Sequence, residues 1–183
     1  MTAKRIEAVL RPASVAVVGA SDTPGSIGEV LCRNLHEGGF RGPVFYVNPR
    51  HASIGDKPSY PDVRSLPQTV DVAIIATPPP TLPTVLEHCG ERGVRGAIIV
   101  SAGFREGGEA GAAWERSMLQ VARRYGLRLL GPNSFGVIRT DNGFNASCGA
   151  ALPKPGRLAL VSQSSALCAA TLDWARSRHV GFS

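Results

Sequence analysis

The chain has 183 residues, of which 43% are hydrophobic and 19% charged, and these ordinary proportions allow one complete domain and part of a second. No apolar run approaches the roughly 20 residues of a membrane span, and charged residues interrupt the first apolar ones, unlike in a signal peptide, so we expect a cytoplasmic protein. The net charge of +6 comes from dispersed basic residues without interleaved aromatic side chains, which argues against a nucleic-acid partner.

The four cysteines are far apart in the sequence and form no C-x-x-C pair, and no histidine stands at metal-ligand spacing. We therefore expect reduced, mostly buried thiols and no metal site. The sequence also offers no Ser-His-Asp set, so we expect no catalytic residues in this chain.

A glycine-rich loop follows the first predicted strand. A predicted short helix over 3–10 leads into the β-branched run Val15 to Val18, which is typical of a buried strand, and a predicted helix over 27–37 follows the loop GASDTPGSIG. Such a loop gathers backbone N–H groups and the positive end of a helix dipole, and therefore binds phosphates. Its spacing is G-x5-G-x2-G instead of the dinucleotide pattern G-x-G-x-x-G, so the nucleotide stays open, and a plain strand-to-helix connection is the alternative.

The tip of the second predicted strand, over 44–47, is basic. It continues into Asn48, Pro49 and Arg50, where an NAD-dependent enzyme would carry Asp or Glu. Arg50 suits a phosphate on an adenosine ribose, which leaves NADP with its 2′-phosphate and CoA with its 3′-phosphate. The alternative is an ordinary solvated arginine.

Three more strands are predicted, over 71–76, 96–100 and 128–130, with helices over 81–93 and 109–125 between them. The first ends in a threonine and three prolines, the second in Ser-Ala-Gly-Phe, and the third in Gly-Pro-Asn-Ser. Residues 51–66 carry no strand or helix period and are predicted as a surface excursion. Because the carboxyl ends of parallel strands share one edge of the sheet, we expect all of these tips to border one cleft.

A second unit is predicted at the end of the chain. Residues 141–156 lose the periodicity and contain Pro153 and Pro155, which is typical of a linker. A strand over 157–161 and a helix over 166–176 follow, with four residues, SQSS, between them. Those serines suit either an anion site or ordinary helix capping.

Several motifs together resemble the NDP-forming acyl-CoA synthetase superfamily in its N-terminal part. They are GASDTPGSIG, VNPRH, IATPPP, SAGF, LLGPNSFG, NAS and LVSQSSAL, in that order along the chain. The resemblance implies an α/β fold: a Rossmann-like parallel-sheet CoA-binding domain at 1–140, a linker at 141–156, and at 157–183 the first strand and helix of an incomplete flavodoxin-like domain. It also implies that CoA or acetyl-CoA is the ligand.

The expected ligand contacts come from the glycine-rich loop and from the four other strand tips. The resemblance places the CoA phosphates at the loop, the 3′-phosphate near Arg50, and the pantetheine arm along the later tips toward the thiol end. The predicted cofactor-binding residues are Gly19, Ser21, Ser26, Ile27, Gly28, Asn48, Pro49, Arg50, Thr77, Pro78, Pro79, Ser101, Ala102, Gly103, Asn133 and Ser134.

Two departures from the superfamily's common pattern bear on function. Many members have cysteine where Ser134 stands and glycine where Ser165 stands, and the serines resemble the branch of bacterial protein lysine acetyltransferases. The first expectation is therefore a CoA- or acetyl-CoA-binding domain of such an acetyltransferase, with a second synthetase domain and a GNAT domain as partners in the same polypeptide. The alternative is the CoA-binding fragment of an ADP-forming acyl-CoA ligase with an ATP-grasp partner, and a remote one is an NADP-dependent reductase.

Overall fold

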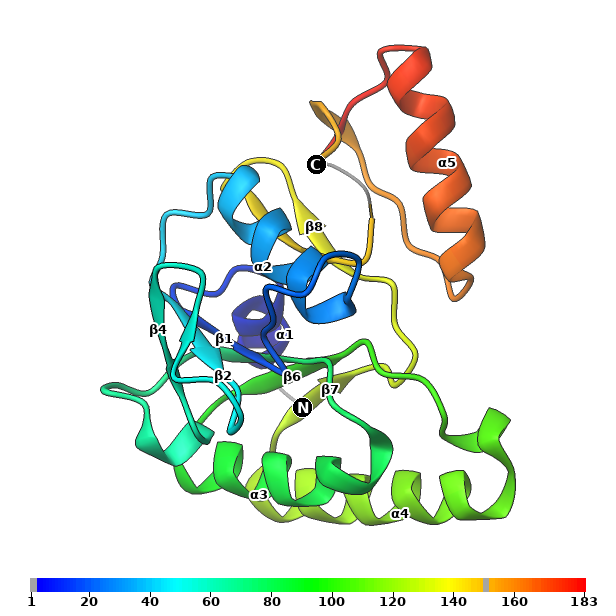
Figure 1. The fold of residues 1–183 in the computed structure, drawn as a ribbon. Coiled ribbons are helices and arrows are strands. Elements are labelled where there is room, and N and C mark those ends of the chain that lie inside the picture. Colours follow the sequence, from blue (N-terminus) through cyan, green and yellow to red (C-terminus); the bar gives the residue numbers. More distant parts are fainter. Residues whose placement is uncertain (1–2, 150–151) are drawn as a thin grey trace.

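A mostly parallel sheet of seven strands runs through the protein. The computed structural model describes residues 3–149 and 152–183, and its sheet has the order β3-β4-β2-β1-β5-β6-β7 (Figure 1). β3 is antiparallel to β4, and the other neighbouring strands are parallel. The strands are β1 (Val15–Val18), β2 (Val44–Val47), β3 (Ser53–Ile54), β4 (Lys57–Tyr60), β5 (Val72–Ile75), β6 (Gly96–Ile99) and β7 (Arg128–Leu130). The predicted α/β class with a Rossmann-like parallel sheet is confirmed.

Helices cover both faces of this sheet. α3 (Leu82–Glu91) and α4 (Gly108–Tyr125) lie on one face, and α1 (Ala3–Leu10) and α2 (Ile27–Glu37) lie on the other (Figure 1). The side chains of β1 pack alternately on the two faces of the sheet. Val15 and Val17 belong to the core under α2, and Ala16 and Val18 belong to the core under α3. A strand buried on both faces needs a continuous apolar run, which is why the sequence predicted it well. No described helix is long and apolar enough to cross a membrane.

Two short hairpins were missed in the sequence. β3 and β4 lie inside the predicted excursion 51–66, and β4 extends the sheet beside β2. β8 (Gly136–Arg139) and β9 (Phe144–Ser147) form an antiparallel pair that packs against α2, so part of the predicted linker 141–156 is instead a buried strand. The residues of β9 do not alternate between a buried apolar face and an exposed polar face. Its polar residues Asn145 and Ser147 are buried and hydrogen-bonded to each other. Residues 150–151 of that linker lie outside the described residues, and the domain division stays a prediction.

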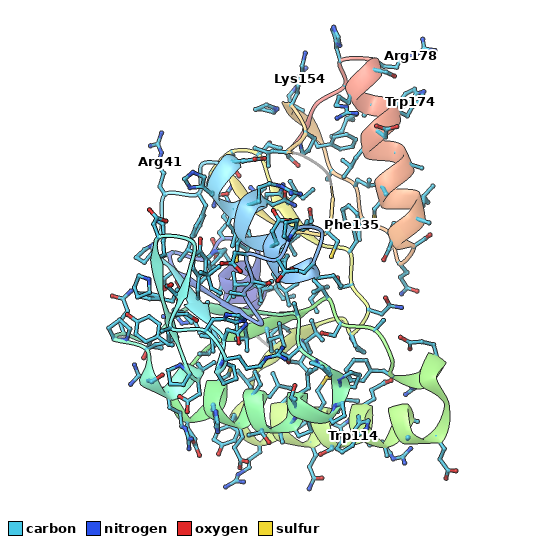
Figure 2. All side chains as sticks on the ribbon, viewed as in Figure 1. Arg41, Trp114, Phe135, Lys154, Trp174 and Arg178 are labelled. Atoms are coloured by element: carbon cyan, nitrogen blue, oxygen red, sulfur yellow. The ribbon has the colours of Figure 1, made fainter. Side chains whose placement is uncertain are left out.

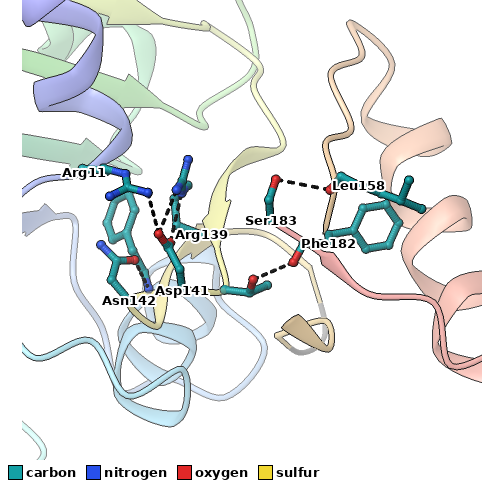
Figure 3. A network of polar contacts seen from close by, with 9 residues as sticks. Arg11, Arg139, Asp141, Asn142, Leu158, Phe182 and Ser183 are labelled. Atoms are coloured by element: carbon teal, nitrogen blue, oxygen red, sulfur yellow. Dashed lines mark hydrogen bonds and ion pairs between the residues drawn. The ribbon is translucent and has the colours of Figure 1, made fainter. Parts of the chain in front are cut away.

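The C-terminal strand and helix lie to one side of the sheet. β10 (Pro155–Leu158) and α5 (Ser165–Ser177) overlap the predicted elements, and three short 3-10 helices complete the described secondary structure: η1 (Val63–Ser65), η2 (Pro79–Thr81) and η3 (Arg105–Gly107). The hydroxyl of Thr140 at the end of β8 donates to the carbonyl of Phe182 at 2.6 Å, which ties this part to the hairpin (Figure 3). α5 remains largely exposed, and Trp174 projects from it into solvent with 57% of its surface accessible (Figure 2).

The cysteines divide into two groups. Cys32 and Cys89 are buried, and burial raises the pKa of Cys32 to about 11 and that of Cys89 to about 12, so both thiols stay protonated and unreactive. Cys148 is exposed and Cys168 is partly buried. The prediction of mostly buried thiols therefore fits two of the four.

Candidate functional site

A cleft of about 1100 Å³ opens at the carboxyl edge of the sheet. It lies at the end of β1, which has β2 on one side and β5 on the other. At this point the order of the strands reverses direction, and parallel sheets of this kind bind ligands there. Its walls come from the ends of β1, β2 and β5, the start of α2, the segment around η1, and α3. The lining residues are Val18, Gly19, Ser21, Thr23, Ser26, Ile27, Gly28, Val47, Asn48, Pro49, Arg50, His51, Pro61, Asp62, Val63, Ala76, Thr77, Pro78, Thr81, Val85 and His88.

The glycine-rich loop brings α2 directly onto the end of β1. A Cβ at Gly28 would lie 2.1 Å from the carbonyl oxygen of Gly19, and a Cβ at Gly19, whose φ is +89°, would lie 2.9 Å from the carbonyl oxygen of Ala76. Both positions therefore require glycine, since any side chain would meet backbone. Gly25 has a positive φ of +78° but open space around it. The loop is thus a tight crossing of three backbone segments at the cleft wall.

The first turn of α2 presents free N–H groups to the cleft. The Ser26 hydroxyl caps the helix by accepting from the Glu29 N–H at 3.2 Å. Within the described part of the chain, the N–H groups of Ile27 and Gly28 have no hydrogen-bond partner. Together with the helix dipole, these two donors suit the oxygen of a phosphate.

The side chain of Asn48 fixes the tip of β2 through hydrogen bonds to the backbone, and these bonds do not involve the guanidinium of Arg50. The buried amide of Asn48 donates to the Ala20 carbonyl at 2.8 Å and accepts from the Arg50 N–H at 3.0 Å. Asn48 lines the cleft, and its side chain holds the β1 and β2 tips together. Its contact with the ligand stays a prediction. The exposed guanidinium of Arg50 has no carboxylate or carbonyl partner among the described residues, so it is available to an anion.

The far wall of the cleft was missed in the sequence. Asp62 caps η1, where it accepts from the Ser65 N–H at 2.9 Å, and His88 comes from α3. Burial alone would raise the pKa of Asp62, but the Ser65 N–H, the Arg64 side chain and the charge of His88 together lower it. The pattern D-x-x-S at 62–65 is a capping signal that could have located η1, although nothing in it points to a cleft.

Ten of the predicted ligand residues line the cleft, and six lie beyond it along the same edge. Those six are Pro79, Ser101, Ala102, Gly103, Asn133 and Ser134. They are joined to one another: the Asn133 N–H donates to the Ser101 carbonyl at 2.9 Å, and a Cβ at Gly103 would touch the Pro79 ring at 3.2 Å. The tips of β5, β6 and β7 therefore form a continuous rim next to the cleft.

Two further residues predicted near the strand tips have defined structural roles. Ser164 caps α5 by accepting from the Leu167 N–H at 3.2 Å, as ordinary helix capping requires. Phe104 is fully buried in the core under α4, where it anchors the loop after β6.

Comparison with known proteins gives a consistent set of relatives. The family model described as CoA binding domain matches residues 13–140. The chain is 43% identical over 178 residues to an ADP-forming acetate–CoA ligase I of Archaeoglobus fulgidus, covering 97% of this chain and 26% of the relative. It is likewise 43% identical over 182 residues to the alpha subunit of an ADP-forming acetate–CoA ligase I of Pyrococcus furiosus, covering 97% of this chain and 39% of the relative.

A solved structure agrees with these relatives. The dinucleotide-forming acetyl-coenzyme A synthetase 1 of Ca. Korarchaeum cryptofilum, in complex with phosphate and ADP, superposes with a TM-score of 0.91 at 36% identity. The superposition covers 97% of this chain and 38% of that one. The chain thus spans about a quarter to two-fifths of the length of the relatives that it matches.

Proposed function

The chain belongs to the CoA-binding domain family, and we propose that it binds CoA as the CoA-binding part of an ADP-forming acyl-CoA ligase. One observation carries the proposal: a single cleft contains two separate groups suited to phosphate, the N–H groups of Ile27 and Gly28 and the guanidinium of Arg50, none of which has a partner among the described residues. CoA carries both a pyrophosphate and a ribose 3′-phosphate, and two such sites suit it.

We assign the pyrophosphate to the glycine-rich loop and the 3′-phosphate to Arg50. The apolar walls formed by Pro61, Val63 and Val85 suit the flat face of the adenine. The pantetheine arm then follows the rim past the β5 and β6 tips toward Asn133 and Ser134 at the β7 tip, and the acyl group of a thioester would lie there. In this arrangement the chain's own residues bind and orient CoA.

The named relatives favour a ligase over a lysine acetyltransferase. Both curated relatives are ADP-forming acetate–CoA ligases, one of them an alpha subunit. The serines at 134 and 165, which suggested an acetyltransferase, stand in a chain otherwise 43% identical to ligases, so two substitutions do not outweigh the rest. An NADP-dependent reductase is disfavoured because the matching family binds CoA.

We further propose that residues 157–183 begin a second unit completed by more of the same polypeptide. Leu158, Val161, Leu167 and Trp174 expose between 56% and 96% of their surface, which is unusual for so many large apolar residues in one strand, loop and helix. The greater length of the relatives supports a partner within the same protein or complex.

The test is calorimetric titration of the chain with CoA, 3′-dephospho-CoA and NADPH. A hydrogen bond to a charged group contributes about 1.5–3 kcal/mol, and because Arg50 is exposed we expect the lower value, so CoA should bind about tenfold more tightly than 3′-dephospho-CoA. Arg50→Met should remove that difference while leaving 3′-dephospho-CoA binding unchanged. Equal affinities in the wild type would refute the role of Arg50, absence of CoA binding would refute the function, and micromolar NADPH binding would favour the reductase.

A further inference from the structure

The loop between β6 and α4 forms the middle of the rim, and it is held from below. Phe104 is fully buried, and the first turn of α4 packs so closely that a Cβ at Gly111 would lie 1.7 Å from the Phe104 carbonyl oxygen. Arg105 in η3 also pairs with Glu115 of α4 at 3.0 Å. The loop after Phe104 therefore has a fixed base.

The part of the loop that faces the rim has a different support. Gly103 has a φ of +98° and is exposed, so its own conformational preferences do not fix it. Its N–H donates to the carboxylate of Glu106 at 2.8 Å. The Glu106 backbone and the N–H groups of Gly103 and Phe104 lower the pKa of this carboxyl, so it is ionised near neutral pH. No basic side chain pairs with Glu106 in the described parts of the chain.

This support lies next to the neighbouring strand tips. A Cβ at Gly103 would touch Pro79 after β5, and the Ser101 carbonyl accepts from Asn133 after β7. The conformation of residues 101–103 therefore affects the rim on both sides. None of these residues lines the cleft in which the phosphate sites lie.

We propose that Glu106 is a positioning residue for the arm of the ligand that leaves the cleft: by holding the Gly103 N–H, it fixes the rim against which the pantetheine arm of CoA packs. This inference rests on the proposed function. A rim that is ordered before binding spares the complex the entropy cost of ordering it. We therefore expect the loss of this order to weaken CoA binding about three- to tenfold.

The experiment compares CoA with adenosine 3′,5′-bisphosphate, which lacks the pantetheine arm. We expect Glu106→Ala to weaken CoA binding about three- to tenfold and to leave bisphosphate binding within about twofold. Glu106→Gln, whose amide oxygen can still accept from Gly103, should bind both like the wild type. Glu109→Ala is the matched control, because Glu109 is also an exposed acid, lies three residues further on, and has no partner in the described residues. Amide hydrogen exchange at Gly103 should accelerate in Glu106→Ala only.

Each remaining outcome decides between the two claims. If Glu106→Ala weakens both ligands equally, or if Glu106→Gln behaves like Glu106→Ala, the positioning role is wrong while the CoA site stands. If wild-type protein binds CoA no more tightly than the bisphosphate, the rim makes no contact with the arm and the inference fails. If the wild type binds neither ligand, the proposed function itself fails and the inference with it.

Discussion

Replacing Gly28 by alanine tests the tight backbone crossing on which the glycine-rich loop depends. The new Cβ would lie 2.1 Å from the Gly19 carbonyl oxygen and 3.1 Å from the Ser21 nitrogen. Cβ atoms essentially never approach within 3.0 Å of another heavy atom, so α2 would have to withdraw by about 0.9 Å. Overpacking costs about 1–3 kcal/mol, and because both neighbours are backbone and cannot rotate away, we expect the upper value.

Thermal unfolding and CoA titration measure the two consequences. For a chain of this size, about 3 kcal/mol corresponds to a fall in Tm of roughly 6–12 °C. The helix start also moves relative to the loop, and because hydrogen bonds weaken steeply with poor geometry, CoA affinity should fall at least about tenfold. Gly107→Ala is the control, because Gly107 has a negative φ and a Cβ there would meet none of the described residues within 4 Å. The Tm and the CoA affinity of this variant should stay at wild-type values. A Gly28→Ala variant that melts and binds like the wild type would refute the crossing.

Two further predictions concern the β8–β9 hairpin. Asn34→Ala removes the buried amide that donates to the Ser147 carbonyl at 2.9 Å and to the Gly149 carbonyl at 2.8 Å. Each carbonyl that loses its partner costs about 1–3 kcal/mol, so the midpoint of urea unfolding should fall clearly. An unchanged midpoint would show that the hairpin does not need this amide. Asp141→Asn removes a carboxylate whose pKa the Arg139 hydrogen bond lowers from its ordinary 3.8 (Figure 3). The ion pair stabilises the fold above pH 3.8, and this stabilisation is lost as the pH falls through the lower pKa of Asp141 in the folded protein. The free energies of unfolding of wild type and variant should therefore differ by up to about 1 kcal/mol at pH 7 and converge in acid. A difference that stays constant with pH would contradict this assignment.

The sheet could be predicted from the sequence because its strands are buried on both faces. Runs such as Val15–Val18 and Val72–Ile75 are apolar throughout, and each is followed by a tip rich in glycine, proline or polar residues. Parallel strands place all these tips at one edge, so the cleft followed from chain order alone. Arg50 could be selected for the same reason, since its position after β2 is set by the topology.

What the sequence could not show depends on contacts between segments far apart in the chain. β9 is stabilised by Asn34 of α2, more than a hundred residues away, and its own residues carry no strand period. β4 is short, contains Pro58, and forms only by extending the sheet at β2. Asp62 and His88 both line the cleft because η1 packs on α3. The side chain of Asn48 donates to the Ala20 carbonyl, which comes within reach only because β1 and β2 are neighbours in the sheet.

The position of α2 links the glycine-rich loop to the rest of the molecule. At its N-terminus, Gly28 presses against Gly19, and in its last turns Asn34 holds the hairpin that contacts the C-terminal part through Thr140 and Phe182. Because packed cores deform little, we expect a displacement of the hairpin to move α2 with it. Since the N–H groups of Ile27 and Gly28 belong to that same helix, we expect the geometry of the proposed phosphate site to depend on the far end of α2 as well as on the loop.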